Sequence, residues 1–393
     1  MTETFDAVIV GGGPAGATAA ADLARHGRSV LLLDKAGRIK PCGGAIPPVA
    51  VREFALPEHL LVARAQGARI VAPSAKQADM PIEGGYVGMV DRDVFDEWLR
   101  ERAASLGASR QAANFARITR DADGVARVHF TPKGESAETS VRARAVIGAD
   151  GAKSAVAKQC VKGAERIRYV FAYHEIVRAP QASEGYDPTR CDIYYQSPLS
   201  PDFYAWVFPH GDTMSIGTGS AKKGFGLRPA VTRLREEAGL AGLETLRREG
   251  APIPMRPMKR WDNGRDVVLA GDAAGVVAPA SGEGIYYAML GGRLAADAVE
   301  QLCATGDVRA LRTARARFMK EHGRVFMVLG FMQWFWYAND KRRELFVKLC
   351  RDPDVQRLTW ESYMNKKMVR RDPMAHVRVF FKDLAHLVGM ARA

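Results

Sequence analysis

The chain has few cysteines and no apolar run long enough to cross a bilayer. Its five cysteines are scattered and form no C-x-x-C pair, which argues against a zinc site or a disulfide framework and favours reduced thiols in a cytosolic protein. The longest apolar run, residues 325–338, falls short of the roughly 20 residues that a spanning helix needs. The N-terminus lacks a basic stretch, so we expect no secretory signal.

Histidine is also scarce, with eight residues at no spacing typical of metal ligands and in no Ser-His-Asp pattern, so we expect no metal.

Negatively charged residues are fewer than positively charged ones. The 57 Lys and Arg residues exceed the 44 Asp and Glu residues by 13. Such an excess favours an anionic partner, whether a nucleotide, a nucleic acid or an acidic membrane, and does not distinguish between them.

The strongest motif lies near the N-terminus. An apolar stretch, residues 5–10, precedes Gly-Gly-Gly-Pro-Ala-Gly, a G-x-G-x-x-G pattern that leads into an alanine-rich helix. Gly11 permits the tight turn, Gly13 allows backbone approach to a pyrophosphate, and Gly16 allows close helix packing. A second strand ends at Asp34, about 20 residues further on, where a carboxylate binds the ribose of an adenine dinucleotide. This unit alone does not separate FAD from NAD.

Two later segments separate these cofactors. Residues 145–150 form an apolar strand that ends in Gly-Ala-Asp-Gly, and residues 267–270 form another that runs into Gly-Asp-Ala-Ala-Gly. With the first motif, they resemble the flavoprotein hydroxylase superfamily, whose FAD domain is assembled from separated segments. The resemblance implies that Asp272 binds the FAD chain and that Asp150 and Gly151 lie near FAD and the pyridine nucleotide. It also implies that Arg92 contacts FAD, although an exposed ion-pairing arginine is the alternative.

Three further segments indicate which family of this superfamily the chain resembles. They are Lys-Pro-Cys-Gly-Gly at residues 40–44, Tyr-Ala-Trp-Val-Phe-Pro-His-Gly at 204–211 and Pro-Ala-Ser-Gly-Glu-Gly-Ile at 279–285. Together with the FAD motifs they resemble the geranylgeranyl reductase family, and most of all its bacterial members in (bacterio)chlorophyll biosynthesis. His210 departs from the lysine that we expect in relatives. We predict that Tyr204, Trp206 and Phe208 share one face of a strand.

The resemblance implies NADPH-dependent reduction of isolated double bonds in a geranylgeranyl chain, carried as the diphosphate or as a (bacterio)chlorophyll ester, to give the phytyl chain. Cys42 and Tyr204 are the candidate catalytic proton donors, with a small packing cysteine and a core tyrosine as alternatives. The substrate-binding candidates are Tyr204, Trp206, Phe208 and His210. The residues expected to bind FAD or NADPH are Gly11, Gly13, Ala15, Gly16, Asp34, Lys35, Cys42, Gly43, Gly44, Arg92, Asp150, Gly151, Asp272, Gly282, Gly284 and Ile285.

We therefore expect an α+β/α/β fold with a Rossmann-type FAD domain, built from residues 1–165 and 259–320. An antiparallel substrate sheet would occupy residues 166–258, including a basic helix near residues 230–248, and a helical, basic segment would form residues 321–393. We expect a helix over residues 90–106. The competing interpretations are an aromatic hydroxylase of the same fold, an archaeal-type prenyl-lipid reductase, and a basic nucleic-acid or membrane-binding protein, which three ordered FAD motifs oppose.

The C-terminal part combines aromatic residues with positive charge. The run Phe-Met-Gln-Trp-Phe-Trp-Tyr at residues 331–337 precedes residues 340–393, in which thirteen Lys and Arg residues face seven Asp and Glu residues. This combination favours peripheral contact with an anionic membrane, so we expect a cytoplasmic protein on the photosynthetic or inner membrane and no nucleic-acid partner. The alternative is a helical cap with a solvated basic face.

Overall fold

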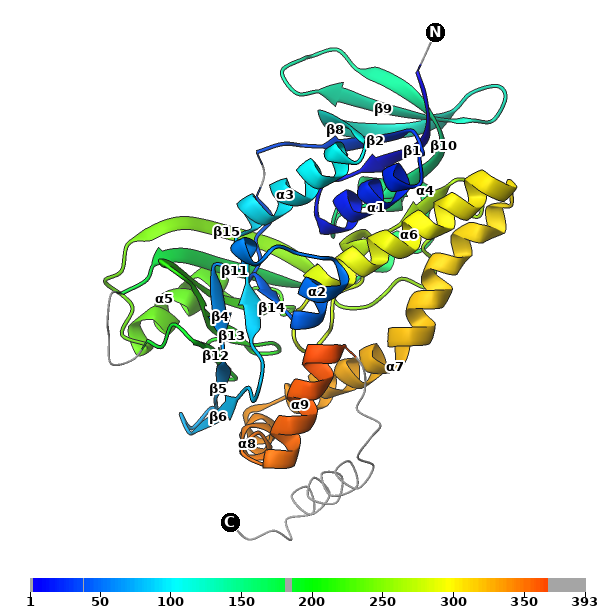
Figure 1. Ribbon diagram of the computed structural model, residues 1–393. Coiled ribbons are helices and arrows are strands. Elements are labelled where there is room, and N and C mark those ends of the chain that lie inside the picture. The colour runs from blue at the N-terminus through cyan, green and yellow to red at the C-terminus, as the bar shows by residue number, and fades with distance from the viewer. Residues whose placement is uncertain (1–2, 38, 181–185, 367–393) are drawn as a thin grey trace. The chain divides into compact units, whose positions relative to one another are not determined.

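The computed structural model describes residues 3–37, 39–180 and 186–366, and the chain divides into two compact units (Figure 1). The first unit contains Met1–Lys40, Arg92–Tyr169 and Pro252–Phe326. The second contains Pro41–Asp91, Val170–Ala251 and Met327–Ala393. The chain therefore passes repeatedly from one unit to the other.

The first unit is built on a six-stranded sheet in which β16, β10, β1, β2 and β8 follow one another in parallel. Strand β9 pairs antiparallel with the C-terminal part of β8 and with the N-terminal part of β10. The apolar residues of β1 are buried, as expected for a strand covered on both faces. The strand bounds are β1 Thr4–Val10, β2 Val30–Asp34, β8 Ser109–Arg120, β9 Ala126–Pro132, β10 Thr139–Gly148 and β16 Val267–Leu269.

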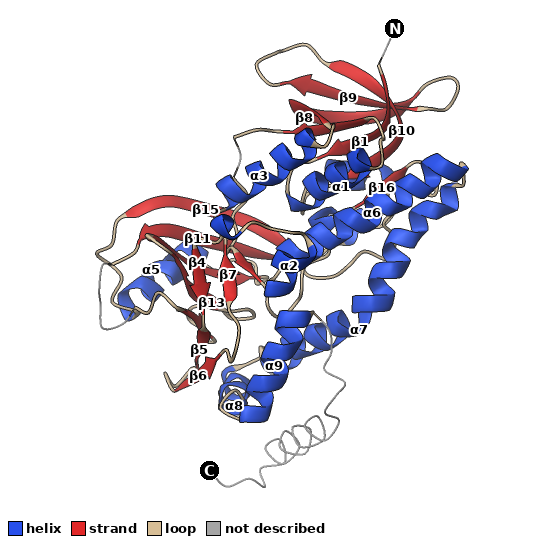
Figure 2. Cartoon of the chain, in the orientation of Figure 1, coloured by secondary structure: helices blue, strands red, loops and turns tan. Residues whose placement is uncertain are grey.

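Helices α1, α3 and α6 of the first unit pack side by side (Figure 2). Small residues permit this close approach, because a Cβ at Gly292 of α6 would overlap the carbonyl oxygen of Ala15 in α1. The alanine-rich sequence of α1 is thus explained by packing as well as by helix propensity. The helices of this unit are α1 Pro14–Arg25, α3 Arg92–Ser105, α4 Ala155–Cys160, η2 Ala164–Arg166, η3 Gly271–Ala274, α6 Ile285–Thr305, η4 Val308–Leu311 and the first part of α7 Arg312–Trp336.

The second unit is built on a seven-stranded sheet in the order β15-β11-β14-β13-β12-β5-β6, in which β12 and β5 are parallel. Helix α5 covers one face, where its Val231 and Leu234 join a core with Val207 and Ile216. The strands are β5 Gly67–Val71, β6 Gln77–Pro81, β11 Tyr169–Arg178, β12 Arg190–Tyr194, β13 Ala205–His210, β14 Thr213–Ser220 and β15 Thr245–Pro254, with β3 Ala45–Ile46, β4 Ala63–Ala65 and β7 Val87–Met89 in a three-stranded sheet. The helices are α2 Pro48–Glu53, η1 Glu58–Leu60, α5 Leu227–Glu237, α8 Asp340–Leu349 and α9 Pro353–Asn365.

Most predicted elements are present, with two differences. The helix expected near residues 230–248 ends at Glu237, because Gly239 adopts a left-handed conformation with φ +70° just beyond it. Arg248 lies instead in strand β15, whose residues alternate in burial. Residues 41–91 also lie in the second unit, whereas the sequence led us to expect them in the first, because β5 pairs with β12.

No helix among the described residues is long and apolar enough to cross a membrane.

Candidate cofactor and substrate sites

The glycine-rich turn joins β1 to α1 with the geometry that its sequence predicts. Gly11 has φ +109°, and a Cβ there would overlap the carbonyl oxygen of Ala149. Helix α1 begins with Pro14, and within the described part of the chain no side chain caps its N-terminus. A Cβ added at Gly13 would meet no heavy atom of the described residues within 4 Å. The result is an open helix N-terminus that can accept a phosphate.

Asp34 ends strand β2 beside this turn. Its carboxylate accepts hydrogen bonds from the amides of Gly12 and Ala36, both at 3.3 Å, and lies 3.5 Å from the guanidinium of Arg100. Arg100 also donates to the carbonyl oxygen of Gly12 at 3.1 Å. No sequence pattern indicated Arg100, which is one of several charged residues on α3. Lys35 is exposed.

The Gly-Asp-Ala-Ala segment forms η3, directly after β16. A Cβ at Gly271 would lie 2.8 Å from the Cβ of Ala15, so this segment is close to the start of α1. Asp272 is buried, and its carboxylate accepts from the ammonium of Lys40 at 2.5 Å. Lys40 neutralises a carboxylate that would otherwise be costly to bury. The sequence motif contained Lys40, but nothing in it indicated this partner.

The second glycine-rich loop leads into α6 beside the same carboxylate. A Cβ on Gly284 would lie 3.9 Å from Oδ1 of Asp272, and Gly284 is the N-cap residue of α6. Gly282 has φ +65°, and Ile285 is buried. Three predicted segments therefore converge: the start of α1, η3 and the start of α6. Two helix N-termini with an open glycine turn and two carboxylates fit the phosphates and hydroxyls of FAD.

Two predicted cofactor residues have protein partners of their own. Arg92, the first residue of α3, is buried and donates to both carboxylate oxygens of Asp96, at 2.7 and 2.6 Å. Asp150 accepts from the amides of Ala155 and Val156, at 2.6 and 3.2 Å, at the start of α4. Their contact with FAD or a pyridine nucleotide stays a prediction, as does that of Gly151.

In the second unit, the side chains of Tyr204, Trp206 and Phe208 form one aromatic row, as predicted. Ring centroids are 5.9 Å apart for Tyr204 and Trp206, and 6.1 Å apart for Trp206 and Phe208. The Pro-Cys-Gly-Gly loop packs on this row, because a Cβ at Gly43 would lie 3.1 Å from the ring of Phe208 and 4.0 Å from Nε1 of Trp206. Glycine at position 43 thus lets the backbone lie close to the aromatic side chains.

The two candidate proton donors differ in burial. The thiol of Cys42 is half-buried and accepts from the amide of Gly44 at 3.4 Å. Burial raises the pKa of the Tyr204 hydroxyl far above its ordinary value, and negative charge on Tyr337 or Cys42 raises it further. Tyr204 therefore keeps its proton at neutral pH.

His210 is buried at the end of the row. A Cβ at Gly44, which has φ +71°, would lie 2.5 Å from Nε2 of this histidine. Burial lowers the pKa of His210 to about 4, against a weaker opposing effect of its hydrogen bond with the carbonyl oxygen of Phe208. The side chain is therefore neutral at physiological pH, unlike the lysine expected in relatives.

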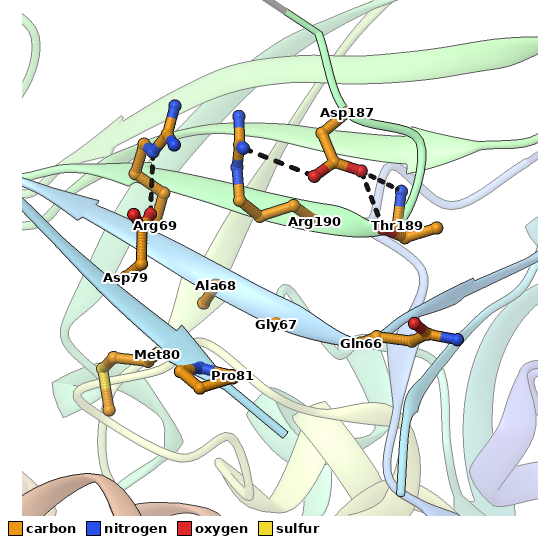
Figure 3. A pocket seen from close by; sticks show the side chains of 10 residues that line it. All are labelled: Gln66, Gly67, Ala68, Arg69, Asp79, Met80, Pro81, Asp187, Thr189 and Arg190. Carbon is orange, nitrogen blue, oxygen red and sulfur yellow. Dashed lines mark hydrogen bonds and ion pairs between the residues drawn. The ribbon is translucent and has the colours of Figure 1, made fainter. Parts of the chain in front are cut away.

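A separate hollow of about 310 Å³ lies along β5 and β6 (Figure 3). It contains none of the candidate residues, and its charges are paired. Arg69 contacts Asp79 at 2.9 Å, and Arg190 contacts Asp187 at 3.4 Å. We find no reason to assign chemistry to it.

Comparison with known proteins identifies related chains. An FAD binding domain family matches residues 55–313, and an NAD(P)-binding Rossmann-like domain family matches residues 9–74. A geranylgeranyl diphosphate reductase of Rhodobacter capsulatus is 56% identical over 98% of both chains. A digeranylgeranylglycerophospholipid reductase of Methanocaldococcus jannaschii is 29% identical over 82% of this chain and 84% of that one. A geranylgeranyl bacteriochlorophyll reductase-like protein from Thermoplasma acidophilum shares the fold, with a TM-score of 0.81, 22% identity, and coverage of 95% and 99%.

Proposed function

This chain belongs to the geranylgeranyl diphosphate reductase family, and from that premise we propose that it reduces isolated carbon–carbon double bonds of a geranylgeranyl chain with FAD as cofactor and NADPH as electron donor. The 56% identity over nearly the whole chain carries this proposal. The archaeal phospholipid reductase is a much more distant relative. The resemblance read from the motifs is confirmed at the level of the family.

The first unit has the groups that FAD requires. The open turn at Gly13 and the start of α1 would hold the pyrophosphate, Asp34 a ribose hydroxyl, and Asp272 the hydroxyls of the flavin chain. Bound FAD supplies hydride transfer, which side chains cannot perform. The remaining task of the chain is to orient the substrate, exclude water and deliver a proton.

The aromatic row of the second unit supports the proposed prenyl substrate. A long hydrocarbon gains about 0.8 kcal/mol for each buried CH₂ group, so flat apolar surface is the main source of its affinity. Tyr204, Trp206 and Phe208 would supply such a surface, and the glycine at position 43 keeps side-chain atoms off their rings. We assign the delivery of the proton to Cys42 or Tyr204, both of which adjoin this surface.

Mass spectrometry of the prenyl product tests the proposal. Purified protein with FAD would be incubated with NADPH or NADH, and with geranylgeranyl diphosphate or the geranylgeranyl ester of bacteriochlorophyllide. We expect products heavier by two hydrogens for each reduced bond, and faster turnover with NADPH. Consumption of oxygen in proportion to substrate, without a saturated product, would instead indicate a hydroxylase.

Substitutions at the proton donors refine this test. Cys42→Ala and Tyr204→Phe should slow alkene reduction while FAD stays bound. Cys160→Ala provides the matched control, because Cys160 is another partly exposed free cysteine and lies in the first unit, on α4. Normal turnover by both Cys42→Ala and Tyr204→Phe would assign the proton to water or to another group.

We also propose peripheral contact with an anionic membrane through the end of α7. Met327, Phe331 and Trp334 follow one another at helical spacing and are 69%, 55% and 70% exposed. Exposed aromatic residues of this kind are typical of interfacial helices. Lys341 is exposed nearby in sequence, and the guanidinium of Arg342 lies 4.3 Å from the ring centroid of Phe335. The rest of the predicted basic tail, residues 367–393, lies outside the described residues.

Flotation with vesicles tests this contact. We expect binding to vesicles that contain anionic lipid, weaker binding at high salt, and loss of binding in Phe331→Glu combined with Trp334→Glu. Leu246→Glu is the control, because Leu246 is 44% exposed in strand β15 of the same unit. Vesicle binding that neither salt nor the double substitution changes would contradict the proposal.

A further inference from the structure

A line of polar side chains, buried except for the half-buried Glu249, crosses the second-unit sheet beside the aromatic row. The indole Nε1 of Trp206 on β13 donates to the hydroxyl of Ser215 on β14 at 3.0 Å. Ser215 lies 2.9 Å from Nδ1 of His174 on β11, and Nε2 of His174 lies 3.1 Å from Glu249 on β15. Four adjacent strands each contribute one member. Arg247 forms an ion pair with Glu249 at the end of the line.

The donors and acceptors at the two ends of this line have fixed roles. An indole N–H can only donate, so Ser215 accepts from Trp206 and shares a second hydrogen bond with Nδ1 of His174. The carboxylate of Glu249 accepts from Nε2 of His174. Burial alone would raise the pKa of Glu249, but the hydrogen bond of His174 and the charge of Arg247 outweigh burial and lower it. A charged carboxylate thus anchors the line.

Register explains why the rings can meet. Gly217 is paired with His174 on one side and with Trp206 on the other. A Cβ there would lie 2.6 Å from the Cβ of His174 and would overlap the indole. Since Gly217 carries no side chain, the indole and imidazole centroids approach to 6.4 Å over it. The same indole also adjoins the loop at Gly43.

We propose that Ser215, His174 and Glu249 are positioning residues that lock the indole of Trp206 in one orientation, so that the aromatic row and the Gly43 loop seat the prenyl chain in a single register. This inference rests on the proposed function, because the chain to be seated is the geranylgeranyl group. The three residues act on the substrate only through Trp206. Without the Ser215 hydroxyl, a buried indole N–H would lose its acceptor, and this orientation of the ring would lose the hydrogen bond that favours it.

Nitrogen-15 labelling of tryptophan tests the orientation without any substrate. The chain has six tryptophans, and the variant Trp206→Phe identifies the Trp206 indole resonance. Ser215→Ala should shift that resonance and speed its exchange with solvent, while the other five stay in place. Ser220→Ala is the matched control, since Ser220 is a buried hydroxyl on the same strand that donates to Asp202. An unchanged Trp206 resonance in Ser215→Ala would overturn the proposal.

Kinetics test the consequence for the substrate. Ser215→Ala should lower kcat/KM for geranylgeranyl diphosphate about fivefold, as for one lost buried hydrogen bond, and broaden the distribution of partly reduced products. FAD content should be unchanged. His174→Asn, which keeps a hydrogen-bonding partner for Ser215, should retain more activity than His174→Leu. If the resonance moves but kcat, KM and products do not, the positioning role is wrong. If the wild-type protein reduces no prenyl substrate, the proposed function fails instead.

Discussion

Replacement of Gly13 by alanine should leave the fold intact and weaken the binding of FAD. Gly13 has φ −75° and ψ −176°, an extended conformation that alanine adopts without strain. Within the described part of the chain, nothing lies within 4 Å of the added methyl group. The neighbours Gly11 and Gly16 differ, because a Cβ at either position would overlap backbone. Only Gly13 of these three can therefore carry a methyl group in the protein without FAD.

The substitution should raise the stability of the FAD-free protein but lower its affinity for FAD. Loss of backbone freedom in the unfolded chain should raise the free energy of unfolding of the FAD-free protein by about 0.4–1 kcal/mol. The methyl group would occupy space that a pyrophosphate needs at the start of α1. Displacement of one or two charge-assisted hydrogen bonds costs about 1.5–3 kcal/mol each, which weakens FAD binding by roughly 10-fold to 20,000-fold.

Titration of the FAD-free protein, followed by flavin fluorescence, measures the affinity, and chemical denaturation measures the stability. Gly242→Ala is the control, because Gly242 also lacks neighbours within 4 Å among the described residues and lies in the second unit. It should leave FAD affinity unchanged. Wild-type FAD affinity in Gly13→Ala would refute the assignment of the pyrophosphate to this turn.

Three further predictions concern stability. Because the pKa of His210 is lowered to about 4 in the folded chain, the unfolded chain takes up the proton first, and stability should fall by about 2 kcal/mol between pH 7.5 and pH 5. Denaturation of His210→Phe at both pH values should show a smaller fall. Asp150→Ala should lower the free energy of unfolding by about 1–2 kcal/mol through the start of α4, with a smaller effect on FAD affinity than Gly13→Ala has. Arg343→Ala should cost about 3 kcal/mol, because the buried guanidinium donates to the carbonyl oxygens of Ser200 and Tyr337, whereas the exposed Lys341→Ala should be neutral in the same denaturation assay.

The parts of the site that lie within one short stretch of sequence were predictable. The turn at Gly11 and the row from Tyr204 to Phe208 depend on local spacing, and the structure places both as expected. The partners Lys40 and Arg100 were not predictable, because their contacts join residues 232 and 88 positions apart. Local patterns determine which backbone forms, whereas ion pairs depend on which elements the fold brings together.

The line from Trp206 to Glu249 shows the same limit. Its members lie on four strands, and nothing in the spacing of one serine, one histidine and one glutamate suggested that they would meet. The helix expected near residues 230–248 failed for a local reason instead, since Gly239 ends the helix after Glu237. A single glycine there outweighed a basic, helix-compatible composition.

The interleaving of the two units has a consequence for synthesis on the ribosome. Strand β10 pairs with β16, which is synthesised more than one hundred residues later. Helix α6 is synthesised later still. The N-terminal glycine-rich turn and helix α1 therefore emerge long before α6, the helix that packs against α1. Neither unit can be produced as one uninterrupted fragment, and nascent chains must remain partly folded until most of the polypeptide has been translated.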